Sequence, residues 1–184
     1  MSDWVYCTGS GGPHLVDREV HEYLESYSGE DVKMVRTGSP SRGSFEIPDL
    51  EDYSVGVGHS AGGLSLARNV YESPDSWDRL VLLDPVTAVE NVGGESFEQR
   101  DYHPKCTVVR AVNSEAKQPL KPIFESWSSQ GEDCYDMRLV QGADHSFEGC
   151  FDEVKAILAD VLGFEDSAYL RDATSTAGNR ISFR

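Results

Sequence analysis

Residues 58–62 read Gly-His-Ser-Ala-Gly and match Gly-x-Ser-x-Gly, the pattern of a nucleophile elbow. In such an elbow the serine occupies a sharp turn from a strand into a helix, with a strained backbone. The crowding in this turn leaves no room for a bulky side chain two residues to either side. This requirement explains Gly58 and Gly62, and it makes Ser60 the candidate nucleophile.

The residues that flank the pattern favour the same turn. We predict a short strand over residues 52–57 and a helix over residues 64–71. The turn would lift the Ser60 hydroxyl clear of the sheet and direct the Ala61 N–H at the same point. The alternative is a glycine-rich turn with a purely structural role. We favour the catalytic interpretation because a suitable histidine follows downstream.

The composition is that of a globular protein. Of 184 residues, 39% are hydrophobic and 26% charged, enough for one domain with a full core. The net charge of −16 opposes binding to nucleic acid or to an anionic membrane surface. No apolar run approaches the roughly 20 residues that span a bilayer, and the N-terminus shows no signal peptide. We therefore expect a cytoplasmic protein, and the sequence leaves its oligomeric state open.

Strand and helix patterns alternate about six times along the chain, which predicts an α/β domain. Residues 79–83 form a continuous apolar run, as expected for a parallel strand covered on both faces. We predict three layers, with helices on both sides of a mostly parallel sheet of about six strands. The domain should span residues 1–164, and residues 165–184 form a polar C-terminal tail. The predicted strands cover residues 4–7, 31–36, 52–57, 79–83, 106–112 and 135–140. One predicted helix begins near residue 15, and three others cover residues 64–71, 120–127 and 147–161.

Residues 8–13, Thr-Gly-Ser-Gly-Gly-Pro, form a glycine-rich loop between the first strand and the first helix. A phosphate-binding loop would end in Gly-Lys-Ser/Thr, and a dinucleotide fingerprint would need a third glycine where His14 stands. An ordinary tight turn and one half of an oxyanion hole remain. We favour the oxyanion hole because a serine elbow follows, with the Ser10 N–H as the donor and the Ala61 N–H as its counterpart.

The serine needs a base, and His145 has the right setting between the last strand and the final helix. The other histidines fit less well. His14 belongs to the first helical turn and could line the pocket rim, and His21 is expected to be solvated in mid-helix. His59 lies beside the nucleophile, and we expect its side chain to point away from it. His103 lies in a loop without distinguishing features.

Two acids could orient the base. Asp84 directly follows the strand after the elbow helix, and Glu115 follows the next strand. Parallel strands end at one edge of a sheet, so both acids would lie on the rim that carries the serine. We favour Asp84 because a strand end fixes its place, and Glu115 is the alternative. Asp144 is adjacent to His145, and adjacent side chains diverge, so we interpret it as a solvated loop acid.

The four cysteines, Cys7, Cys106, Cys134 and Cys150, show neither a CxxC pair nor metal-ligand spacing. We interpret them as free, mostly buried thiols. We therefore expect neither a metal site nor an organic cofactor.

Three motifs in this order resemble the α/β-hydrolase superfamily: residues 8–12, residues 58–63 and residues 142–147, Gly-Ala-Asp-His-Ser-Phe. The segment 82–86, Leu-Leu-Asp-Pro-Val, is similar to the acid position of thioesterase-type members. The chain departs from the superfamily pattern because its first strand already bears the oxyanion loop and no insertion is long enough for a large lid. Thr8 stands where a histidine often precedes the loop glycine. The resemblance implies esterase-like chemistry at an open site of a minimal hydrolase fold.

The residues together predict two-step acyl transfer, with Ser60 as nucleophile, His145 as base and Asp84 as orienting acid. The expected substrate is a small-molecule carboxylic ester or thioester. The alternatives are a lipase, amidase or lyase of the same fold, or a fold relative that binds ligands without catalysis.

Overall fold

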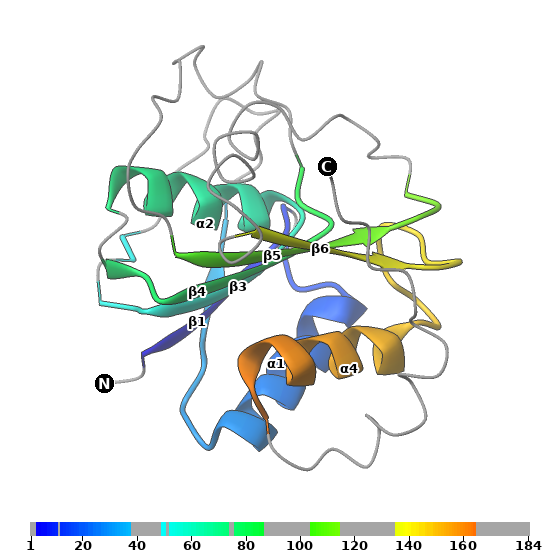
Figure 1. The fold of residues 1–184 in the computed structure, drawn as a ribbon, viewed down its shortest axis with the longest axis horizontal. Helices are drawn as coiled ribbons and strands as arrows, with labels where there is room; N and C mark the ends of the chain where they lie inside the picture. The colour runs from blue at the N-terminus through cyan, green and yellow to red at the C-terminus, as the bar shows by residue number, and fades with distance from the viewer. Residues whose placement is uncertain are drawn as a thin grey trace.

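The computed structural model in Figure 1 describes residues 3–10, 12–37, 49–50, 52–73, 76–86, 104–114 and 135–164. Four expectations lie outside the described residues: the helix over 120–127, the tail 165–184, and the places of Glu115 and His103.

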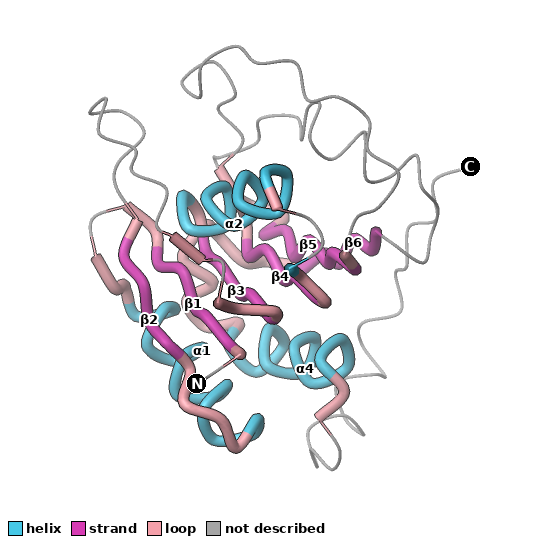
Figure 2. The backbone as a smooth tube through the Cα atoms, turned by 90° about the vertical axis from the view of Figure 1, so that its left-hand side faces the viewer, coloured by secondary structure: helices cyan, strands magenta, loops and turns pink. Residues whose placement is uncertain are grey.

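A six-stranded, fully parallel sheet forms the centre of the described structure. Its order is β2-β1-β3-β4-β5-β6, and Figure 2 shows the strands side by side in this order. Strand β2 therefore lies beside β1 on one side of the β1/β3 pair, and β4, β5 and β6 follow β3 on the other. Because all the strands are parallel, the carboxyl ends of all six lie at one edge of the sheet. The strands are β1 (Trp4–Thr8), β2 (Lys33–Arg36), β3 (Val55–His59), β4 (Arg79–Leu83), β5 (Lys105–Ala111) and β6 (Tyr135–Val140).

Helices cover both faces of this sheet. Helices α1 (Leu15–Ser28) and α4 (Phe151–Leu162) pack on one face, and α2 (Ala61–Glu72) covers the other (Figure 1). The predicted three-layer α/β/α architecture with about six strands is confirmed. Within the described part of the chain, no helix combines the length and apolarity that crossing a bilayer would take.

Strand β4 contributes side chains to the hydrophobic clusters on both faces of the sheet. Leu80 and Leu82 pack with α2, whereas Val81 and Leu83 point to the opposite face and pack with α1 and α4. All four side chains are fully buried. A strand covered on both faces has no solvent side, so its sequence is apolar without alternation.

Three element boundaries differ from those predicted. Strand β3 begins at Val55 rather than at residue 52 and extends to His59, which pairs with the end of β4. Helix α2 begins at Ala61 because tertiary packing overrides the low helix propensity of the glycines in its first turn. Helix α4 begins at Phe151; Phe147 is buried in the core but has a φ of 53° and lies in the preceding turn.

The cysteines within the described residues are free thiols, as predicted. Cys7 and Cys106 are buried in strands, and Cys150 is partly exposed before α4. Cys134 lies outside the described residues.

Candidate active site

Ser60 occupies a strained turn between β3 and α2, with φ 56° and ψ −120°. Its backbone is held by the neighbouring strand: the Ser60 N–H donates to the Leu83 carbonyl at 3.0 Å, and its own carbonyl accepts from Val86 N–H at 3.1 Å. Such a strained conformation is stable only where contacts with the surrounding structure hold it in place. The sheet therefore fixes the direction of the serine hydroxyl before any ligand arrives.

Close contacts explain the two glycines of the elbow. A Cβ on Gly62 would lie 2.0 Å from the Cys7 carbonyl oxygen, and a Cβ on Gly58 would lie 2.8 Å from the Gly62 backbone. Neither neighbour is a flexible side chain that could move aside. The crowding expected from the sequence pattern is thus present, and the end of β1 is part of its cause.

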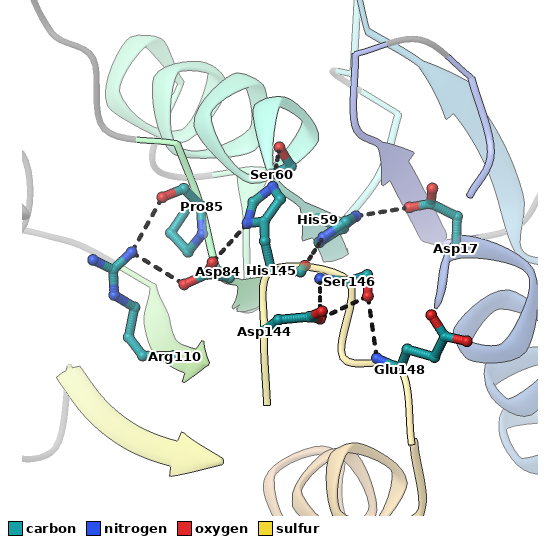
Figure 3. Close-up of polar contacts among 10 residues, drawn as sticks. All are labelled: Asp17, His59, Ser60, Asp84, Pro85, Arg110, Asp144, His145, Ser146 and Glu148. Carbon is teal, nitrogen blue, oxygen red and sulfur yellow. Dashed lines mark hydrogen bonds and ion pairs between the residues drawn. The ribbon is translucent and has the colours of Figure 1, made fainter. Parts of the chain in front are cut away.

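His145 connects the serine to an acid, as Figure 3 shows. Its Nε2 lies 2.9 Å from Ser60 Oγ, and its Nδ1 lies 2.6 Å from Asp84 Oδ2. An Nδ1–H that donates to the carboxylate leaves the Nε2 lone pair free to accept the serine proton. The three residues predicted from the sequence are therefore brought together in the geometry that activates a hydroxyl.

Asp84 is fully buried and sits in a left-handed backbone conformation with φ 39°. Its Oδ1 faces Arg110 Nη1 at 3.3 Å, an ion pair without hydrogen-bond alignment. Arg110 Nη1 also donates to the Pro85 carbonyl at 3.4 Å. Sequence reasoning missed Arg110, although a single charged residue inside an apolar strand was the signal that could have found it.

Asp84 is held in its ionised form. Burial would raise the pKa of Asp84, but hydrogen bonds from His145 and Ser114 and the charge of Arg110 outweigh it, so the pKa lies below its usual value. An ionised carboxylate at this place can fix the His145 tautomer and stabilise the imidazolium that forms when the ring takes a proton.

Backbone strain gathers around these residues. Among the described residues, the only non-glycine positions with positive φ are Ser60, Asp84 and Phe147. Phe147 follows His145 by two positions and anchors its loop in the core.

Asp144 is not a partner of His145 and instead accepts hydrogen bonds from the N–H and Oγ of Ser146, at 2.9 and 2.6 Å. It is a loop acid, as expected.

The His59 side chain contacts the loop that carries His145, a contact that the sequence did not predict. Its ring centroid lies 5.0 Å from that of His145, and its Nε2 lies 2.9 Å from the His145 carbonyl oxygen. On its other side, Nδ1 lies 3.3 Å from Asp17 Oδ1 (Figure 3). The reason is that β3 extends to His59, so the residue directs its side chain to the α1 face of the sheet.

A cavity of about 620 Å³ opens in front of the serine. Ser60 and His145 line it, together with Ser10 and His14 from the start of α1 and Asn113 after β5. His14 thus lies at the pocket, where the sequence suggested it could. The described lining residues are serines, histidines, Asn113 and Asp144, but more of the surface that they expose to the cavity is apolar than polar.

Solved structures resemble this chain over most of its length. Est1E from Butyrivibrio proteoclasticus superposes with a TM-score of 0.62 at 13% identity, over 86% of this chain and 85% of its own. A lid-less serine hydrolase from Xanthomonas campestris gives 0.57 at 15%, over 91% and 85%. The chain has the α/β-hydrolase fold. An S-formylglutathione hydrolase from Agrobacterium tumefaciens also matches, with a TM-score of 0.57 at 14% identity over 88% and 83%. No protein-family model and no curated protein sequence matches it.

In this α/β-hydrolase fold the two expected oxyanion donors flank the nucleophile. Ala61 is the first residue of α2, where the N–H groups are not used by the helix's own hydrogen bonds. Ser10 lines the cavity from the other side. Its neighbour Gly9 approaches so closely that a Cβ there would lie 3.2 Å from Ser60 Cβ.

The described part of the hydrolase fold contains no group of three or more His, Cys, Asp or Glu side chains placed to hold a metal ion.

Proposed function

We propose that this protein is a serine hydrolase that cleaves a carboxylic ester or thioester through an acyl-enzyme on Ser60. One observation carries the proposal: Ser60 Oγ, His145 and Asp84 form an unbroken line of contacts at 2.9 and 2.6 Å beside an open cavity. A serine hydroxyl alone is a poor nucleophile at neutral pH, and this line supplies both the base and the group that orients it.

In the first step the Ser60 oxygen attacks the substrate carbonyl carbon while His145 Nε2 takes the hydroxyl proton. The carbonyl π electrons move to its oxygen, and the Ala61 and Ser10 N–H groups bind the resulting oxyanion. Collapse of this tetrahedral intermediate expels the alcohol or thiol, which receives the proton from His145. The acyl group remains on Ser60.

In the second step His145 takes a proton from water as the water attacks the acyl carbon. The Ser60 oxygen leaves and recovers its proton from His145, which releases the acid product and restores the enzyme. Asp84 stays ionised throughout and stabilises the imidazolium. The mechanism requires no metal ion or organic cofactor.

The similar structures support an acyl hydrolase. Est1E has been solved with ferulic acid bound, and the Agrobacterium protein is a formylglutathione hydrolase by name. The cavity of about 620 Å³ suits a small or medium-sized substrate, and the serine, histidine and asparagine side chains in its lining can hydrogen-bond to groups near the scissile bond.

The test is labelling by a fluorophosphonate probe followed by peptide mapping, with Ser60→Ala as the control. We expect a single adduct on Ser60 and none in the variant, whose fold should be unchanged by circular dichroism. A panel of matched esters, thioesters and amides then assigns the substrate class; turnover of amides alone would favour an amidase. A folded wild-type protein that takes no label would contradict the proposal and favour the non-catalytic binding protein.

A further inference from the structure

A second histidine–carboxylate pair lies directly behind the proposed base. His59, at the end of β3, contacts Asp17 of α1 through Nδ1 and the His145 carbonyl oxygen through Nε2, at 3.3 and 2.9 Å. Figure 3 shows the His59 ring between the other two residues. The mechanism described above does not use this pair.

Asp17 is an unusual residue for the core side of a helix because it is fully buried. It accepts hydrogen bonds from three elements: Tyr6 O–H of β1 at 2.8 Å, His14 N–H at 2.6 Å, and the His59 ring. Burial would raise the pKa of this carboxyl, but the hydrogen bond and charge of His59 and the other two donors outweigh it and lower the pKa. Asp17 is therefore a buried carboxylate that needs a positive partner.

Both contacts of His59 are with hydrogen-bond acceptors. The His145 backbone carbonyl can only accept, so Nε2 donates its N–H there. The Asp17 carboxylate lies on the Nδ1 side of the ring. The His59 ring is therefore held between a buried carboxylate of α1 and the backbone of the loop that carries His145.

We infer that the His59–Asp17 pair is a positioning device that holds the backbone of the base His145. The inference rests on the proposed function, because it assigns a task within that reaction. His145 lies in the irregular loop between β6 and α4, where no helix or strand ladder fixes its carbonyl. The His59 N–H anchors that carbonyl while Asp84 orients the ring. The base is therefore fixed at both its backbone and its side chain.

Among the described residues, few charged or titratable groups face His59. They are Asp17 from α1 and His145 from the loop; Tyr6 of β1 reaches it only through Asp17, and Phe147 presents an uncharged ring edge. His59 is the member of the pair nearer to His145 (Figure 3).

Two substitutions test the anchor. His59→Asn is too short to donate to the His145 carbonyl, so kcat should fall about 10- to 100-fold with little change in KM, as expected for a misplaced catalytic group. His59→Gln keeps an N–H donor of similar reach and should retain more of kcat than His59→Asn.

His21→Gln is the matched control. His21 Nε2 contacts the Val32 carbonyl at 2.6 Å and Nδ1 lies 3.6 Å from Glu25, the same kinds of partner away from the cavity. This variant should leave kcat and KM unchanged. If His59→Asn behaves like His21→Gln in both, the inference is overturned.

A spectroscopic measurement on the unaltered protein keeps the test independent of whether the variants fold. The ring ¹⁵N chemical shifts of His59 should show a proton on Nε2, the nitrogen that faces the His145 carbonyl, and a ring protonated on Nδ1 alone would overturn the anchor. The outcomes distinguish this inference from the proposed function. A wild type that labels on Ser60 at the same rate as His59→Asn overturns the inference alone, whereas a folded wild type that takes no label overturns the proposed function and the positioning role with it.

Discussion

The two histidine–carboxylate pairs of this protein have the same components and opposite settings. The His145 side chain is 37% exposed and lies 2.6 Å from Asp84, whereas the His59 side chain is 3% exposed and lies 3.3 Å from Asp17. Both carboxylates are fully buried. The second ring nitrogen of His145 meets the Ser60 hydroxyl, and that of His59 meets a backbone carbonyl.

The difference shows that a histidine–carboxylate pair does not by itself make a base. A hydroxyl can give up its proton, so the ring beside it can cycle between neutral and charged forms. A carbonyl can only accept, so the ring nitrogen that faces it donates and acts as a fixed anchor. The third partner and access to solvent assign the roles.

Breaking the exposed pair at its histidine should have the largest effect. His145→Gln removes the proton acceptor, and we expect kcat/KM to fall at least about 10⁴-fold, because the triad acts as a unit. The half-exposed side chain leaves the fold intact, which thermal unfolding checks. A loss of less than about tenfold would show that another group serves as base.

Breaking the same pair at its acid should cost nearly as much. Asp84→Asn permits the wrong tautomer of His145, and a fall of about 10⁴-fold in kcat is expected from that cause. Glu115→Gln is the comparison, since this residue was the alternative acid on sequence grounds, and it should retain kcat. Steady-state kinetics of the two variants would reverse the assignment if Glu115→Gln were the damaged one.

A smaller effect should follow from loosening the support of the exposed pair. Because the pKa of Asp84 lies below its usual value, its ionisation stabilises the fold above the unfolded-state pKa of about 3.9, and this stability is lost as pH falls through the lower folded value. Arg110→Gln removes a charge that contributes to the shift. The loss of stability in acid should be smaller and should be complete at a higher pH, because the folded-state pKa of Asp84 moves toward the unfolded value; neutral-pH stability should drop by about 2 kcal/mol.

Urea unfolding between acid and neutral pH measures this shift. Arg138→Gln is the control, because Arg138 pairs with Asp136 and Asp160 on the surface, far from the cavity lining. This control variant should lose stability over the same acid pH range as the wild type. If the stability of the Arg110 variant fell with pH in the same way as that of the Arg138 variant, Arg110 would have no part in holding Asp84 ionised.

The arrangement of Ser60, His145 and Asp84 was predictable because each of the three residues is marked by the sequence next to it. Ser60 is marked by its glycines, and Asp84 and His145 each follow a predicted strand, so the parallel topology places them at one edge. The same logic predicted the three layers and the strand count.

The second pair was not predictable because its members are marked only by their tertiary partners. Asp17 and His59 are 42 positions apart and meet through the β1–α1–β3 packing. An acid in a first helical turn is ordinarily an exposed dipole partner, so the sequence of α1 alone gives no reason to bury Asp17. The start of α2 was missed for a similar reason, since the contact of Gly62 with β1 outweighs local propensity.

The measurement that tests the central claim most directly is the second-order rate constant of fluorophosphonate labelling for wild type, Asp84→Asn and Asp17→Asn, taken side by side. This rate reports activation of Ser60 without any assumption about the natural substrate. The account predicts a fall of about 10⁴-fold for Asp84→Asn and about 10- to 100-fold for Asp17→Asn. Equal losses in the two variants, or a larger loss for Asp17→Asn, would contradict the assignment of catalysis to the His145–Asp84 pair and of positioning to the His59–Asp17 pair.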